Sequence, residues 1–125
     1  SLDMFLAIDC GNTNIVFALY RDEKKSDPII WRCQTNGRKT ADEYASWLSP
    51  LLHHENLKFS DIKDILIASL VPDVNFNLCA LCDKYIKVKP EFIRGDGTNT
   101  NLKIDMLKPI LLKKEEFVLC TNVIF

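Results

Sequence analysis

Three segments in the first third of the chain are rich in apolar residues, and each has the length of a β-strand. Met4–Ile8 and Ile15–Tyr20 are continuously apolar. In Ile29–Thr35, apolar and polar residues alternate, which is typical of a strand with one exposed face. The pattern therefore predicts that the chain opens with a meander of three strands.

A helix is expected to follow this meander. Thr40–Glu43 has the capping-box pattern, in which the Thr40 hydroxyl and the Glu43 carboxylate satisfy each other's free backbone donors. Apolar residues then recur at helical spacing, at Ala41, Tyr44, Ala45, Leu48, Leu51 and Leu52. Pro50 lies inside this pattern, so we expect the helix to bend there or its regular part to end near Ser49.

The following segments predict two more strands and a second helix. Ile65–Val71 is a continuously apolar run of strand length, the mark of a strand covered on both faces, and Pro72 ends it. A helix from about Asp73 to Tyr85 and a short strand at Glu91–Arg94 come next, before a turn-rich loop at 95–101. The predicted order is β-β-β-α-β-α-β, an α/β fold with a mixed sheet and flanking helices.

Composition fits these elements into one domain. The 125 residues, 47% of them hydrophobic, can build one core but are too few for two ordinary domains. No apolar run approaches the roughly 18 residues of a membrane span and no leader pattern is present, so we expect a cytoplasmic protein without a membrane partner. The net charge of -1 and the scattered Lys and Arg argue against nucleic acid as a partner. Ser1–Asp3 looks like a cloning remnant ahead of Met4.

The five cysteines favour free thiols in a reducing compartment, because their number is odd and their spacing is wide. Cys79 and Cys82 have the spacing of a redox or zinc half-site. The chain has no second closely spaced pair that would complete a zinc site, and both cysteines fall inside an amphipathic helical stretch. We therefore interpret them as core residues.

The candidate chemistry lies between the first two strands, in the segment Asp9–Asn14. A carboxylate at the end of a strand, followed by a tight turn of small hydrogen-bonding residues, can hold a phosphate group and its metal ion. Gly11 permits positive φ and close approach to a ligand, while Asn12 to Asn14 offer side-chain donors beside backbone N–H groups. Asp9 would bind or orient Mg²⁺, which prefers oxygen ligands. The residues alone leave an ordinary hairpin turn open, since hairpins also use Gly and Asn.

Three segments, Asp9–Asn14, Arg38–Ala45 and Ile67–Pro72, resemble in order and spacing the N-terminal motifs of the type III pantothenate kinases. The resemblance runs from about Met4 to Leu102 and implies the ribonuclease-H-like core of the actin-like ATPases. It also implies ATP-dependent phosphorylation of pantothenate, the first step towards coenzyme A, with Mg²⁺, a monovalent cation (K⁺ or NH4⁺) and a homodimer. The cofactor-binding candidates are Asp9, Cys10, Gly11, Asn12, Thr13, Asn14, Ile15 and Val16, with Asp9 at the metal.

Beyond Leu102 the likeness ends. Family members carry a Gly-Ala-Asp-Arg segment near here, whose aspartate is the base for the pantothenate hydroxyl and whose arginine helps bind pantothenate. Lys113–Glu116 stands near the expected place, so no catalytic residue is assigned. Family members also have a second domain that closes over the nucleotide. We expect residues 4–105 to be the N-terminal kinase-like domain and 106–125 to be a divergent or truncated tail. This N-terminal half of the kinase is expected to be inactive alone. A non-catalytic nucleotide-binding or regulatory module is the alternative.

Overall fold

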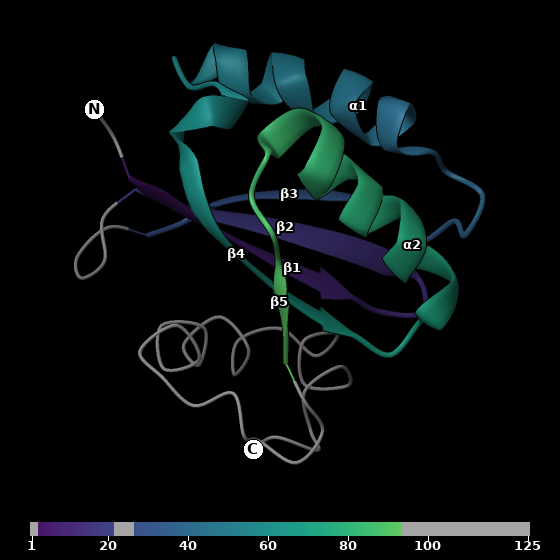
Figure 1. Ribbon diagram of the computed structural model, residues 1–125. Helices are drawn as coiled ribbons and strands as arrows, with labels where there is room; N and C mark the ends of the chain where they lie inside the picture. The colour runs from purple at the N-terminus through teal and green to yellow at the C-terminus, as the bar shows by residue number, and fades with distance from the viewer. Residues whose placement is uncertain (1–2, 22–26, 94–125) are drawn as a thin grey trace.

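A computed structural model describes residues 3–21 and 27–93, so the expected domain end at 105 and the tail 106–125 lie outside these residues. They contain a five-stranded sheet and two α-helices (Figure 1). The strands are β1 (Met4–Cys10), β2 (Asn14–Tyr20), β3 (Ile29–Gln34), β4 (Ile62–Ser69) and β5 (Glu91–Phe92). The helices are α1 (Ala41–His54) and α2 (Pro72–Leu81), with a 3-10 turn at Phe59–Asp61 and a π-helical turn at Cys82–Ile86. The predicted order is confirmed.

The sheet is mixed, with the strand order β3-β2-β1-β4-β5. β1 pairs antiparallel with β2 and parallel with β4. At the outer edges, β3 pairs antiparallel with β2, and β5 pairs parallel with β4. Because β1 and β4 are parallel, their last residues, Cys10 and Ser69, pair at the same edge of the sheet. The start of β2 and the end of β3 meet there as well, where Asn14 pairs with Gln34. We call this edge the carboxyl edge.

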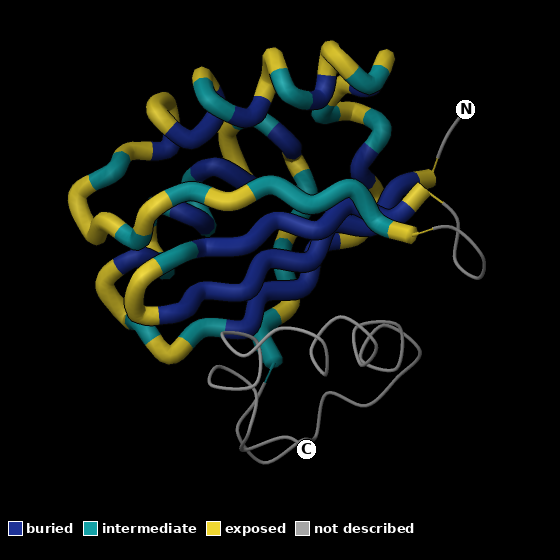
Figure 2. Tube along the Cα trace, turned by 180° about the vertical axis from the view of Figure 1, so that it is seen from behind, coloured by how far each residue is buried: buried dark blue, intermediate teal, exposed yellow. Residues whose placement is uncertain are grey.

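Both described helices cover the same face of the sheet (Figure 1). Alternate strand residues point to opposite faces, so each central strand contributes to two apolar clusters. The helix-side cluster includes Leu6, Ile8, Phe17, Tyr44, Leu48, Ile67, Val74 and Leu78. The opposite face carries a second cluster of Phe5, Ala7, Val16, Ala18, Tyr20 and Leu66. Figure 2 shows the resulting burial along the central strands, and β4 is buried on both faces from Ile65 to Ala68, as predicted.

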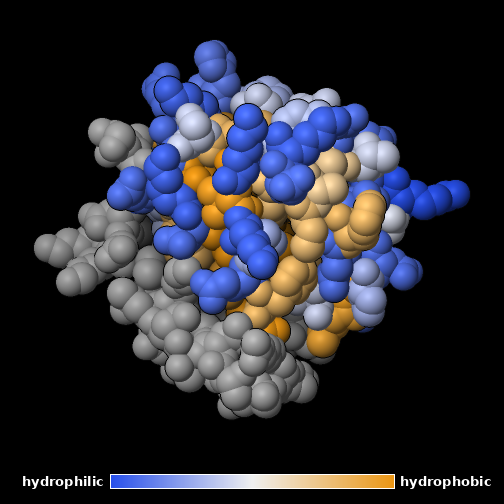
Figure 3. Space-filling model, viewed as in Figure 1, coloured by the Kyte–Doolittle hydropathy of each residue, from blue (hydrophilic) through white to orange (hydrophobic). Residues whose placement is uncertain are grey.

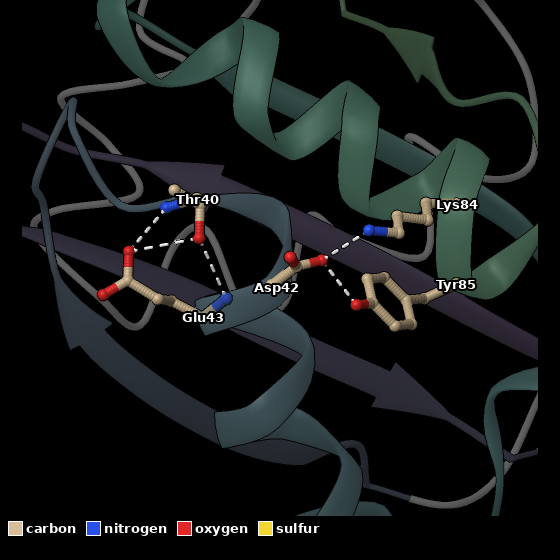
Figure 4. A network of polar contacts seen from close by, with 5 residues as sticks. All are labelled: Thr40, Asp42, Glu43, Lys84 and Tyr85. Atoms are coloured by element: carbon tan, nitrogen blue, oxygen red, sulfur yellow. Dashed lines mark hydrogen bonds and ion pairs between the residues drawn. The ribbon is translucent and has the colours of Figure 1, made fainter.

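Helix α1 begins with the predicted capping box (Figure 4). The Glu43 amide donates to Thr40 Oγ1 at 3.2 Å, and the Thr40 amide donates to Glu43 Oε1 at 2.9 Å. The neighbouring Asp42 carboxylate accepts from Lys84 Nζ at 2.8 Å and from the Tyr85 hydroxyl, which lowers the Asp42 pKa. The start of α1 is thus joined to the π-helical turn, 42 residues away in sequence.

Of the two expectations for Pro50, an end of the regular helix near Ser49 is wrong, because α1 continues through Pro50 to His54. Proline removes the hydrogen bond to the carbonyl four residues earlier, here that of Ser46. Both Ser46 and Pro50 lie on the exposed side of α1, where water can replace this bond. The buried Leu48 and Leu52 keep the last turn packed on the sheet.

The second helix changes geometry near its end. The α-helical part stops at Leu81, and the predicted remainder to Tyr85 lies in the π-helical turn. Lys87 then takes a left-handed conformation with φ of 65°, and its amide donates to the Cys82 carbonyl. Cys82 is fully buried, as interpreted above, whereas Cys79 is only half-buried. In the described part of the chain, no helix has the length and apolar character needed to cross a membrane.

Thr40→Ala is expected to lower the free energy of unfolding by about 1 kcal/mol, because it removes the side-chain cap of α1. Ser49→Ala is the matched control, since Ser49 is an exposed residue of the same helix without a capping role. It should stay within about 0.5 kcal/mol of the starting protein. Urea denaturation followed by circular dichroism measures both, and equal stability of the two variants would contradict the capping role.

Candidate functional site

The turn Gly11–Thr13 joins β1 to β2 at the carboxyl edge. Cys10 pairs with Ile15 across it, and the Gly11 amide donates to the Asn14 carbonyl at 2.9 Å. The segment is therefore a hairpin, the alternative that the residues left open. Gly11 is buried, whereas Asn12 and Thr13 are exposed. A hairpin of this kind can still bind a ligand through its exposed tip.

Two other segments hold the carbonyl groups of this turn. Thr35, directly after β3, donates its amide to the Thr13 carbonyl at 2.9 Å and its hydroxyl to the Gly11 carbonyl at 2.7 Å. Leu70, directly after β4, donates its amide to the Cys10 carbonyl at 3.4 Å. The turn is thus fastened between the ends of the strands on either side of the β1–β2 hairpin.

The amide groups at the tip of the turn, unlike the carbonyl groups of Gly11 and Thr13, have no described hydrogen-bond partner. Within residues 3–21 and 27–93, no group accepts a hydrogen bond from the amide of Asn12 or Thr13. Successive exposed N–H groups in a turn create a small concave surface that attracts anions. The tip of this hairpin therefore has the chemistry of a phosphate-binding turn.

Asp9 lies two residues before the turn, at the next-to-last position of β1, and is only 3% exposed. It pairs with Val16 on β2 and Ala68 on β4, so strand alternation places it on the face opposite the helices. A carboxylate among apolar neighbours is costly unless hydrogen bonds or a cation balance its charge. Asp9 therefore lies at the carboxyl edge, on the side of the sheet that the described helices do not cover.

The site's residues fit a hard cation that shares its ligands with a nucleotide. No cluster of three or more His, Cys, Asp or Glu in the described residues could enclose a metal ion. Mg²⁺ does not need such a cage, because it keeps several waters and is commonly bound by one or two carboxylates together with substrate phosphates. Asp9 beside an anion-binding turn matches that ligand set.

The other predicted residues contribute through packing and backbone. Ile15 and Val16 are the second and third residues of β2 and are fully buried. Ile15 belongs to the helix-side cluster, whereas Val16 pairs with Asp9 on the opposite face. Burial raises the Cys10 pKa to about 12, with a smaller contribution from the Asp9 charge, although a hydrogen bond with Ser69 opposes the shift. Cys10 is therefore a protonated core thiol.

Two residues near the site were missed by the sequence reasoning. Thr35 holds the turn, as described above, and Arg32 on β3 pairs with Val16. Arg32, Val16 and Asp9 therefore lie in one row across three strands on the same face, with the Cα of Arg32 about 10 Å from the Cα of Asp9 by the usual strand spacing. The exposed position of Arg32 within an alternating strand was the available signal.

A pocket of about 600 Å³ lies away from this turn, at the other end of α2. Its lining combines apolar and charged residues: Cys79, Asp83, Lys87, Val88, Lys89, Pro90 and Phe92. None of the predicted site residues lines it, so the pocket and the turn are separate features.

The five-stranded mixed sheet and its flanking helices form an α/β domain of the actin-like ATPase class. A family model described as type III pantothenate kinase matches residues 5–112, further than the end near Leu102 that the motifs suggested. A type III pantothenate kinase from Bacillus cytotoxicus is 41% identical over 106 residues, which cover 85% of this chain and 39% of that protein. The chain belongs to the type III pantothenate kinase family. It spans about two fifths of the length of this relative.

The buried thiols should be protected from alkylation in the folded protein. Burial raises the pKa of both Cys10 and Cys82 to about 12, so iodoacetamide at pH 8 meets protonated, inaccessible sulfur. Cys79 is half-buried and should react first of these three. Peptide mapping by mass spectrometry measures the order, with labelling in denaturant as the control. Native labelling of Cys10 as fast as that of Cys79 would contradict the burial of this strand end.

Proposed function

We propose that this chain supplies the nucleotide-phosphate-binding half of a type III pantothenate kinase, which transfers the γ-phosphoryl group of ATP to pantothenate. That reaction is the first step towards coenzyme A. The observation that carries the proposal is the turn Gly11–Thr13, which follows the buried Asp9 closely in sequence. Thr35 holds the carbonyls of Gly11 and Thr13, and no described residue accepts a hydrogen bond from the amides of the exposed Asn12 and Thr13. Membership of the type III pantothenate kinase family supports the proposed reaction.

Each part of the site has a distinct task under this proposal. The amides of Asn12 and Thr13, with their side chains, donate hydrogen bonds to phosphate oxygens. Asp9 holds Mg²⁺ through its carboxylate, and the ion supplies positive charge that offsets the negative charge of the phosphates. The buried Ile15 and Val16 anchor the start of β2, so that the turn keeps its place at the carboxyl edge.

The remaining expectations concern the whole enzyme. We expect a monovalent cation, K⁺ or NH4⁺, as a further cofactor, pantothenate as the second substrate, work in the cytoplasm, and a homodimer. Figure 3 shows apolar side chains gathered around α2 on one face of the molecule, among hydrophilic ones. Phe76 on α2 is 80% exposed, and Leu70 just before the helix is 47% exposed. The gathered apolar surface, rather than either residue alone, supports a contact with another domain or subunit.

Asp9→Asn should abolish Mg²⁺-dependent ATP binding, because the amide keeps the size of the side chain but removes the charge that binds the cation. Asp83→Asn is the matched control. Asp83 is exposed and lines the separate pocket at the other end of α2, so its variant should bind like the starting protein. Isothermal titration calorimetry with ATP, with and without Mg²⁺, makes the comparison. Equal binding by the Asp9 variant would leave the turn an ordinary hairpin.

These 125 residues by themselves should show no pantothenate phosphorylation and should bind nucleotide only weakly. The motifs assigned here provide phosphate contacts but no general base, and a base alone is typically worth about 10²–10⁴-fold in rate. Chromatographic detection of phosphopantothenate after incubation with ATP is the measurement, with a full-length family member as the positive control. Clear turnover by the homogeneous chain would overturn this expectation and exclude the alternative of a non-catalytic binding or regulatory module.

A further inference from the structure

Thr35 makes two hydrogen bonds to the hairpin turn from a position 24 residues away in sequence. Its backbone amide reaches the Thr13 carbonyl at 2.9 Å, and its hydroxyl reaches the Gly11 carbonyl at 2.7 Å. The side chain is half-buried, so the hydroxyl lies between β3 and the turn. These two bonds enclose Asn12, whose side chain is exposed.

Because the peptide group is planar, the hydrogen bond from the Thr35 hydroxyl to the Gly11 carbonyl also orients the Asn12 amide. In a trans peptide, the carbonyl of one residue and the amide of the next lie in one rigid plane and point in opposite directions. Fixing the Gly11 carbonyl on Thr35 therefore fixes the Asn12 amide, which points away from Thr35. This amide is one of the two for which no described residue is an acceptor.

We propose that Thr35 is a positioning residue for nucleotide binding, whose hydroxyl holds the Gly11–Asn12 peptide so that the Asn12 amide faces the phosphate groups. This role rests on the proposed phosphate-binding function of the turn. It adds that the Thr35 hydroxyl determines the orientation of the Asn12 amide. Thr35 itself touches no phosphate in this account. A loose turn would have to be ordered on binding, and part of the interaction free energy would be lost in that ordering.

Two substitutions at this position separate the hydroxyl from the rest of the side chain. Thr35→Val keeps the shape and the backbone bond to Thr13 but leaves the Gly11 carbonyl without the hydroxyl donor. Thr35→Ser restores the donor with less packing. If the hydroxyl orients the turn, Thr35→Val should weaken Mg²⁺–ATP binding on the order of tenfold, the worth of about one hydrogen bond. Thr35→Ser should stay within about twofold of the starting protein.

Thr40→Val serves as the matched control for stability. It removes a threonine hydroxyl that caps α1 and makes no bond to the turn. It should therefore lower the melting temperature while leaving the Kd for Mg²⁺–ATP unchanged. The measurement is a titration of the ¹⁵N-labelled chain with Mg²⁺–ATP, followed through the backbone amide signals. Chemical-shift dispersion shows that each variant is folded.

The outcomes distinguish this proposal from the proposed function. Binding by Thr35→Val equal to that of the starting protein, or equal loss in the valine and serine variants, would overturn the positioning role but leave the phosphate turn intact. Absence of any binding by the starting protein would overturn the proposed function itself. Should Thr35→Val not fold, the starting protein still decides, because the Asn12 amide must be among the signals that shift most on Mg²⁺–ATP addition. Shifts that spare Asn12 would contradict the proposal.

Discussion

The structure depends on the position of β1 between an antiparallel and a parallel neighbour. This central strand is buried along its whole length, and its alternation contributes residues to both apolar clusters. At its last two residues the same alternation sends Cys10 into the helix-side core and Asp9 to the opposite face. A shift of register by one residue would exchange these two side chains. The pairing that builds the core therefore also decides where the carboxylate lies.

The turn after β1 obtains its order from the strands around it rather than from its own sequence. Gly11 and Asn14 close the hairpin, but the carbonyls of Cys10, Gly11 and Thr13 are each held by a residue that follows another strand. Because Ser69 pairs with Cys10 across a parallel ladder, Leu70 arrives beside the turn without any local turn signal. The proposed phosphate binding would therefore require little further ordering of this turn.

Much of the fold could be predicted from local patterns. The apolar runs gave the strands, and Thr40 with Glu43 gave the start of α1, since capping needs only residues three positions apart. The predicted end near Ser49 was wrong because the free-energy cost of a proline inside a helix depends on how exposed the lost hydrogen bond is. Tertiary packing determines that exposure. The π-helical turn at Cys82–Ile86 had no local signal, and it is joined to α1 through Asp42.

The candidate site was predictable only in part, because some of its residues meet through tertiary packing rather than through local sequence. Asp9 and the small residues after it could be recognised because they are contiguous in the chain. Thr35 could not be recognised, and the alternation in β3 marked Arg32 only as an outward-facing cation. The contact of Thr35 with the turn and the alignment of Arg32 with Asp9 follow from the register of β3 against β2. That register depends on how the whole sheet packs, and no short segment encodes it.

The central claim is that Asp9 and the turn after it hold the metal and the phosphates of a nucleotide. Mn²⁺ suits the same oxygen ligands as Mg²⁺, and its unpaired electrons broaden nearby amide signals. Titration of the ¹⁵N-labelled chain with Mn²⁺–ATP should first remove the amide signals of Gly11 to Asn14 and Leu70. Amide signals of Asp83, Lys87 and Lys89, which line the separate pocket, should remain sharp. Selective broadening at that pocket with sharp signals from the turn would contradict the account.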